Sequence, residues 1–151
     1  MMLAMVAVLA GCGGTKQEGN AKIPKDTLVV GLAVDLASID PAVAMENWQV
    51  PYPCYERLVK YKTTSDGKAS TEVGPSLAKS WTVSDDGLVW TFKLEPGHKF
   101  ADGSNVDAAA VKFSFDRVKA IKKGPSDYFK VVKSVEAPDP DTVVITLNKP
   151  F

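Results

Sequence analysis

The chain has 151 residues, of which 45% are hydrophobic, and its 18 basic side chains are balanced by 18 acidic ones. This is an ordinary globular composition. The basic residues are scattered rather than clustered, so the sequence predicts neither a nucleic-acid partner nor a polyanionic surface.

Residues 1–11 form an uninterrupted run of apolar and small side chains in front of Cys12. The run is too short to span a bilayer, which takes roughly 20 apolar residues, but it fits the hydrophobic region of a secretory signal peptide. The positively charged residues that normally precede this region are missing. Either the true start codon lies upstream or the clone begins inside the signal.

The run ends in Leu9-Ala10-Gly11-Cys12, which looks like a bacterial lipobox. Small residues before the cysteine suit a signal peptidase, so we expect Cys12 to be lipidated and to become the mature N-terminus. The alternative is an ordinary cleaved signal with an incidental cysteine. Residues 12–26 are then a lipidated cysteine and a flexible tether, because residues 13–22 are small and polar with no apolar period.

Assigning Cys12 to a lipid leaves Cys54 alone, which excludes an internal disulfide framework within this stretch. Free cysteine is among the most buried residue types. Cys54 is therefore predicted to be a small buried residue rather than a nucleophile.

Residues 27–33 (TLVVGLA) are apolar and β-branched without a helical period, which predicts a strand buried on both faces. Residues 34–41 break this pattern with Asp35, Ser38 and Asp40-Pro41, which favour turns and extended loops. A loop that leaves a central strand is a natural position for ligand contact, although it can equally be a mere connection.

The middle of the chain predicts short strands joined by turns. Two early prolines in residues 48–61 indicate a short helix that runs into a strand at residues 58–61, and Asp66-Gly67 marks a turn. Alternation in residues 81–83 and 89–94, separated by residues 84–87 (SDDG), predicts a β-hairpin. Further turns at residues 95–98 and 101–103 extend it into a meander of short antiparallel strands.

Residues 108–121 are predicted to form an amphipathic helix. Asp107 is a suitable N-cap, and Ala108, Val111, Phe115 and Val118 fall on one stripe that would pack on the sheet. Residues 131–137 and 142–147 flank a proline-rich turn and predict a last hairpin.

No catalytic or metal-binding residue is predicted. The candidates Asp85, Asp86, Glu95, His98 and Asp102 all fall in predicted turns, where such residues serve the backbone. A lone histidine supplies too few ligands for zinc, and no serine is paired with an oriented base. Of the tryptophans, Trp81 and Trp90 lie inside the strand pattern and are predicted to be core, whereas Trp48 lies in a loop and remains a ligand-binding candidate.

Short motifs occur along the chain at residues 27–31, 38–41 (SIDP), 55–59 (YERLV), 77–81 (LAKSW), 84–87, 90–94 (WTFKL), 99–100, 102–103, 107–113, 135–139 and 142–144. In this order and spacing they resemble the bacterial extracellular solute-binding proteins of family 5, the peptide/nickel-binding proteins of ABC importers. The resemblance covers residues 27–151. It departs at Glu95, where the family usually has arginine, and at Ala109 or Ala110, where the family usually has an acidic residue.

The resemblance implies an α/β fold that is part of lobe I of a two-lobed periplasmic-binding-protein-like fold of type II. We expect a mixed sheet with a β-meander and packed helices. Residues 27–151 would be the N-terminal part of the solute-binding domain, incomplete at the C-terminus. The resemblance also places residues 34–38 at the cleft between the lobes, so Leu36 and Ala37 are the ligand-binding residues that we predict together with Trp48.

The implied function is that of a substrate-binding subunit, not an enzyme and without a cofactor. It would capture an oligopeptide or dipeptide outside the cytoplasmic membrane, close by a hinge and deliver the ligand to an ABC permease and its ATPase. The protein would be lipid-anchored in the periplasm or on the outer cell surface. Two alternatives remain: a nickel or metallophore receptor of the same family, and a lipid-anchored enzyme or sensor that reuses the fold.

Overall fold

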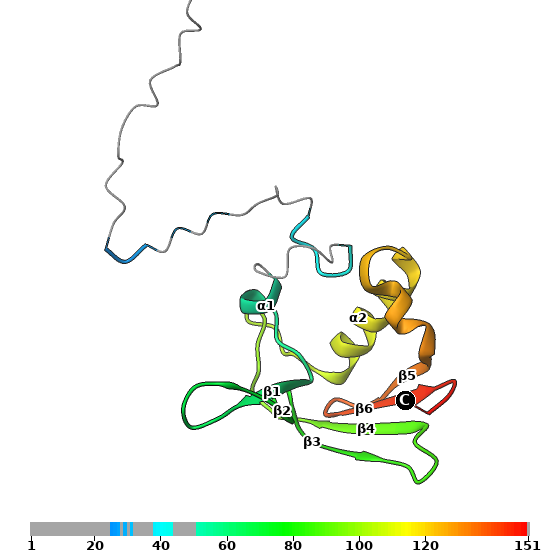
Figure 1. The fold of residues 1–151 in the computed structure, drawn as a ribbon. Helices are drawn as coiled ribbons and strands as arrows, with labels where there is room; N and C mark the ends of the chain where they lie inside the picture. The colour runs from blue at the N-terminus through cyan, green and yellow to red at the C-terminus, as the bar shows by residue number, and fades with distance from the viewer. Residues whose placement is uncertain (1–24, 28, 30, 32–37, 44–50, 151) are drawn as a thin grey trace, which may run out of the picture. The chain divides into compact units, whose positions relative to one another are not determined.

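The computed structural model describes residues 25–27, 29, 31, 38–43 and 51–150 (Figure 1). The chain divides into two units, residues 1–35 and 36–151, and every helix and strand that the structure describes belongs to the second. The buried strand predicted for residues 27–33 is wrong at its described positions. Thr27, Val29 and Gly31 are exposed and lie in no strand. A strand buried on both faces needs neighbouring strands, and none of the described strands pairs with this segment.

The described strands form two antiparallel sheets. A two-stranded sheet has the order β1-β2 and a four-stranded sheet has the order β3-β4-β6-β5. In chain order the elements are α1 (Pro51–Cys54), β1 (Val59–Thr63), β2 (Ala69–Pro75), β3 (Ala78–Val83), β4 (Val89–Leu94), α2 (Ala108–Ile121), the 3₁₀ helix η1 (Gly124–Val131), β5 (Val132–Asp139) and β6 (Thr142–Leu147). The α/β class is confirmed, as are the predicted helices and hairpins.

The mixed sheet is not found in the part of the chain that the structure describes, because each described strand pair is antiparallel. The reason lies in the connections. Tight turns join β1 to β2, β3 to β4 and β5 to β6, and tight turns permit only antiparallel pairing. The long connection through α2 joins β4 to β5, but β6 lies between these two strands. The meander is also shorter than predicted, since Lys99 and Asn105 form only an isolated bridge.

Two of the predicted turn residues, Asp86 and Asp102, serve the backbone as expected. Asp86 accepts hydrogen bonds from the Ser84 hydroxyl and from the Leu88 amide, which closes the β3–β4 turn. Asp102 accepts equivalent bonds from the amide and the hydroxyl of Ser104. These carboxylates are thus part of exposed Asx-type turns, as the sequence predicted.

The core lies between the four-stranded sheet and α2, which covers one face of that sheet (Figure 1). Trp81 and Trp90 pack against this cluster, each with its ring centroid 6.4 Å from that of Phe92, so their prediction as core residues is confirmed. The buried cluster consists of Ala78, Phe92, Leu94, Ala108, Val111, Val132, Val135, Val143, Ile145 and Leu147.

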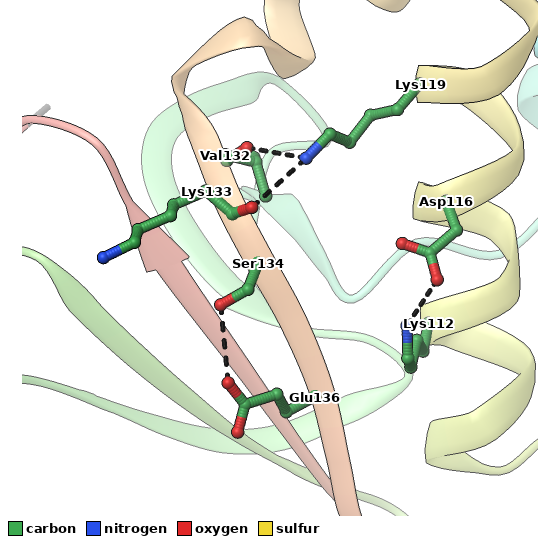
Figure 2. Close-up of polar contacts among 7 residues, drawn as sticks. All are labelled: Lys112, Asp116, Lys119, Val132, Lys133, Ser134 and Glu136. Carbon is green, nitrogen blue, oxygen red and sulfur yellow. Dashed lines mark hydrogen bonds and ion pairs between the residues drawn. The ribbon is translucent and has the colours of Figure 1, made fainter.

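Helix α2 is attached to the sheet along its length. Asp107 caps it by accepting a hydrogen bond from the Ala110 amide at 2.8 Å, and Val111 is buried, as predicted. Toward the other end, Lys119 donates to the carbonyl groups of Val132 at 2.8 Å and Lys133 at 3.4 Å, at the start of β5 (Figure 2). Both apolar packing and this charged contact therefore hold α2 in place.

Cys54 is exposed, so its predicted burial is wrong. It ends α1, a single turn of four residues, none of which is buried. So short a helix lacks an apolar stripe that could carry the cysteine into the core.

Candidate functional site

The predicted site residues Leu36, Ala37 and Trp48, and the predicted lipidation site Cys12, lie outside the described residues. The structure does describe residues 38–43, which follow Leu36 and Ala37 directly. We name residues 38–43 the Asp40 turn. The Asp40 turn is the part of the chain next to the predicted ligand-binding residues that the structure describes, and its contacts show how it is held.

The sequence of the Asp40 turn explains its conformation. The Asp40 amide donates to the Ser38 hydroxyl at 3.1 Å, and the Ala42 amide donates to a carboxylate oxygen of Asp40 at 3.0 Å. The Val43 amide closes the turn by donating to the Asp40 carbonyl at 3.0 Å. Serine and aspartate commonly bond nearby amides in this way, and Pro41 adds a fixed φ.

Arg117 of α2 binds Asp40 with both arms of its guanidinium group. One nitrogen donates to Oδ1 at 2.9 Å and the other to Oδ2 at 2.5 Å. Two parallel charge-assisted bonds fix the orientation of both groups as well as their distance. The partners are 77 positions apart in the chain, and their side chains are 39% and 30% exposed.

The pair stays charged under ordinary conditions. The hydrogen bond from Arg117, followed by the bond from the Ala42 amide, lowers the pKa of Asp40 from 3.8 to about 2. The same hydrogen bond raises the pKa of Arg117 above its ordinary value. A carboxylate held this firmly in its ionised form is unsuited to general acid or base catalysis near neutral pH, so the pair positions the turn.

We expect Arg117→Gln to return the pKa of Asp40 from about 2 toward its ordinary value of 3.8. Because the pKa is lowered in the folded state, the pair stabilises the docked turn above the ordinary pKa, and this stabilisation is lost as the pH falls through about 2. The two proteins should therefore differ in turn stability near neutral pH and converge in strong acid. Carboxyl-carbon NMR titration of Asp40 measures this. If Asp40 titrates identically in the variant, the hydrogen bond from Arg117 is not what lowers the pKa of Asp40.

Gly124 also lies close to the Asp40 turn, next to the backbone of Val43. It begins η1 with a φ of 49°, and a Cβ built on it would lie 2.5 Å from the carbonyl oxygen of Val43. Ala42, in the middle of the turn, is 3% exposed. The turn is therefore packed closely against the start of η1 as well as bonded to α2.

The described residues offer little support for metal-based or acid–base chemistry. Within residues 25–27, 29, 31, 38–43 and 51–150, no three or more His, Cys, Asp or Glu side chains lie together as a metal site would require. His98 pairs with Glu56, with 3.0 Å between Nδ1 and Oε2. This partner was not predicted from the sequence.

Among the residues that the structure describes, no helix has the length and hydrophobicity needed to cross a membrane.

An apolar hollow of about 240 Å³ lies between the sheet, α2 and η1. The surface that lines this hollow is wholly apolar, and the side-chain N–H of Trp90 donates to the carbonyl of Gly87. Small-molecule sites need polar groups that orient the ligand, so we assign this hollow to the core. Its lining consists of Trp90, Phe92, Phe115, Val131, Val132, Ile145 and Leu147.

Comparisons with known proteins agree with one another. The model for bacterial extracellular solute-binding proteins, family 5 Middle, matches residues 72–151. The probable D,D-dipeptide-binding periplasmic protein DdpA of Escherichia coli (strain K12) is 50% identical over 134 residues, which cover 87% of this chain and 26% of that protein.

The solved structures that are similar to this fold include a nickel-complex-binding and a peptide-binding protein. The crystal structure of NikZ from Campylobacter jejuni in complex with Ni(L-His) has a TM-score of 0.74 and 34% identity, and the match covers 85% of this chain and 25% of that one. DppA from Helicobacter pylori in complex with the peptide STSA has a TM-score of 0.60 and 34% identity, covering 77% and 26%. The chain thus spans about a quarter of the length of these relatives.

Proposed function

Because the chain belongs to the bacterial extracellular solute-binding proteins of family 5, we propose that it is part of the substrate-binding subunit of an ABC importer that captures a short peptide. The observation that carries the peptide assignment is the 50% identity with the probable D,D-dipeptide-binding protein over 87% of this chain. The subunit would take a dipeptide or oligopeptide outside the cytoplasmic membrane and pass it to a permease driven by an ATPase.

The role that we propose for this part of the protein is binding without covalent chemistry. The sheet and α2 supply a rigid support, and Arg117 and Gly124 hold the Asp40 turn against it. Leu36 and Ala37, which directly precede this turn in the sequence, would then contact the ligand. Closure of a second lobe over the ligand would complete the site and mark the loaded form for the permease. Trp48 is a further proposed contact.

A nickel-complex receptor is the second candidate, because the similarity to NikZ in complex with Ni(L-His) reaches a TM-score of 0.74. The sequence identity with that protein is 34%, against 50% with the probable D,D-dipeptide-binding protein. We therefore place the peptide first. The two ligand classes can be separated by direct titration.

We further propose that the protein is held at the membrane by lipid on Cys12. The support is the lipobox-like Leu9-Ala10-Gly11-Cys12 at the end of an apolar run. Several acyl chains on one cysteine bind a membrane firmly without a spanning helix. This anchor would keep the receptor close to its permease.

Calorimetry on the intact gene product tests the proposed function. We expect binding of at least one member of a panel of dipeptides and tetrapeptides that includes D-alanyl-D-alanine, and no binding of Ni(L-His). Leu36→Asp should weaken the binding about tenfold or more, because it places a desolvated charge against the ligand. Tight binding of Ni(L-His) with no binding of peptides would favour the second candidate.

Tyr61→Asp is the matched control. It adds the same charge at a side chain of β1 that is 70% exposed. We expect this variant to bind peptide as the wild type does. Full affinity in Leu36→Asp would remove residue 36 from the site.

A further inference from the structure

Helix α2 presents Arg117 from a backbone that is fixed at both ends. Asp107 caps its first turn, and Ala108 is fully buried beneath it. Two residues beyond Arg117, Lys119 bonds the first two carbonyl groups of β5 (Figure 2). The side chain of Arg117 therefore extends from a helix whose backbone is fixed to the sheet.

Arg117 contributes little to that support itself. Its side chain is 39% exposed, it lies outside the hydrophobic cluster, and the two hydrogen bonds described for it both go to Asp40. Glutamine at this position would keep a good helix former while removing the charge and the planar fork. The residue can thus be changed without dismantling α2.

We infer that Arg117 is a positioning residue for ligand binding, and that it acts through Asp40 on the residues directly before the Asp40 turn. The inference rests on the proposed function, in which Leu36 and Ala37 contact the ligand. Covalent geometry supplies the coupling. Leu36 and Ala37 directly precede the turn in the sequence, and successive Cα atoms are linked at a fixed separation of about 3.8 Å, so a constraint on the turn is passed to them through the backbone.

Docking the turn on α2 before the ligand arrives reduces the conformational freedom that these residues lose on binding. The apparent dissociation constant equals the intrinsic one divided by the fraction of molecules in the competent conformation. If loss of the ion pair lowers that fraction to about a tenth, the affinity falls about tenfold. A partly exposed ion pair contributes little to global stability, so this fall should occur without a matching loss of stability.

The experiment compares Arg117→Gln with Lys112→Gln in the intact gene product. Lys112 pairs with Asp116 on the same helix (Figure 2), so its replacement removes a comparable ion pair that has no described bond to the Asp40 turn. Hydrogen–deuterium exchange of residues 38–43 is measured without ligand, and affinity is measured by calorimetry with the same peptide panel. We expect Arg117→Gln to exchange about tenfold faster and to bind about tenfold more weakly. Lys112→Gln should match the wild type in both, and the melting temperatures should agree.

Asp40→Asn provides a second variant, which should reproduce the loss, and the double variant should be no weaker than either single one. Unchanged affinity in Arg117→Gln, with peptide bound by the wild type, would overturn the positioning role and leave the proposed function standing. An equal loss in Lys112→Gln would overturn it as well. Failure of the wild type to bind any member of the panel would overturn the proposed function and the positioning role together.

Discussion

Gly124→Ala is expected to lower the free energy of unfolding by about 3 kcal/mol, with the damage centred on the Asp40 turn. Two effects combine. A side chain at the left-handed φ of 49° is strained, and the new Cβ would lie 2.5 Å from the carbonyl oxygen and 2.7 Å from the carbonyl carbon of Val43. Both neighbours are backbone atoms, which cannot swing aside as the end of a long side chain would. Urea unfolding of the intact gene product, followed by tryptophan fluorescence, measures the loss.

Gly67→Ala separates the clash from the strain. Gly67 has a φ of 79° in the β1–β2 turn, and a Cβ there would meet nothing within 4 Å. We expect this control to cost about 1 kcal/mol, which is the strain alone. Equal losses in the two variants would show that Val43 does not pack against Gly124 in solution. The Asp40 turn would then not be held by the start of η1.

Cys12→Ala is expected to move the intact gene product from the membrane fraction almost entirely into the soluble fraction. The reason is that the acyl chains on Cys12 would supply the attachment, at about 0.8 kcal/mol for each buried methylene group. Detergent phase partitioning of cell extracts measures the shift, and metabolic labelling with a fatty acid shows whether the lipid is lost with it.

Cys54→Ala is the control for this experiment. Cys54 is exposed at the end of α1, so an unspecific modification of accessible cysteine would be lost in this variant instead. We expect Cys54→Ala to remain in the membrane fraction with its label. The lipobox interpretation is wrong if Cys12→Ala and the wild type partition identically.

Sequence similarity and the structure give different information about this chain. Similarity shows the family to which it belongs, whereas the described contacts show how the Asp40 turn is held. The Arg117–Asp40 pair had no signal in the sequence. Arg117 lies outside the apolar stripe predicted for residues 108–121, and Asp40 was predicted only as a turn residue, which it also is.

Sequence alone determined the elements whose causes are local. The β3–β4 hairpin follows from alternation around residues 84–87, and the start of α2 follows from Asp107, whose carboxylate bonds an amide three positions away. Ser38, Asp40 and Pro41 likewise predicted a turn, because their effects act within a few residues. The family resemblance also rested on the order of such local motifs, and it is confirmed.

Which distant segments meet depends on tertiary packing. It placed β6 between β4 and β5, left Cys54 exposed, and brought Arg117 to Asp40 across 77 positions of sequence. Residue patterns repeat with the periods of a helix or a strand, so they indicate which face of an element is apolar but not which element covers it. The partner of a charged side chain depends on how whole elements pack, and that packing is settled by the burial of the entire core.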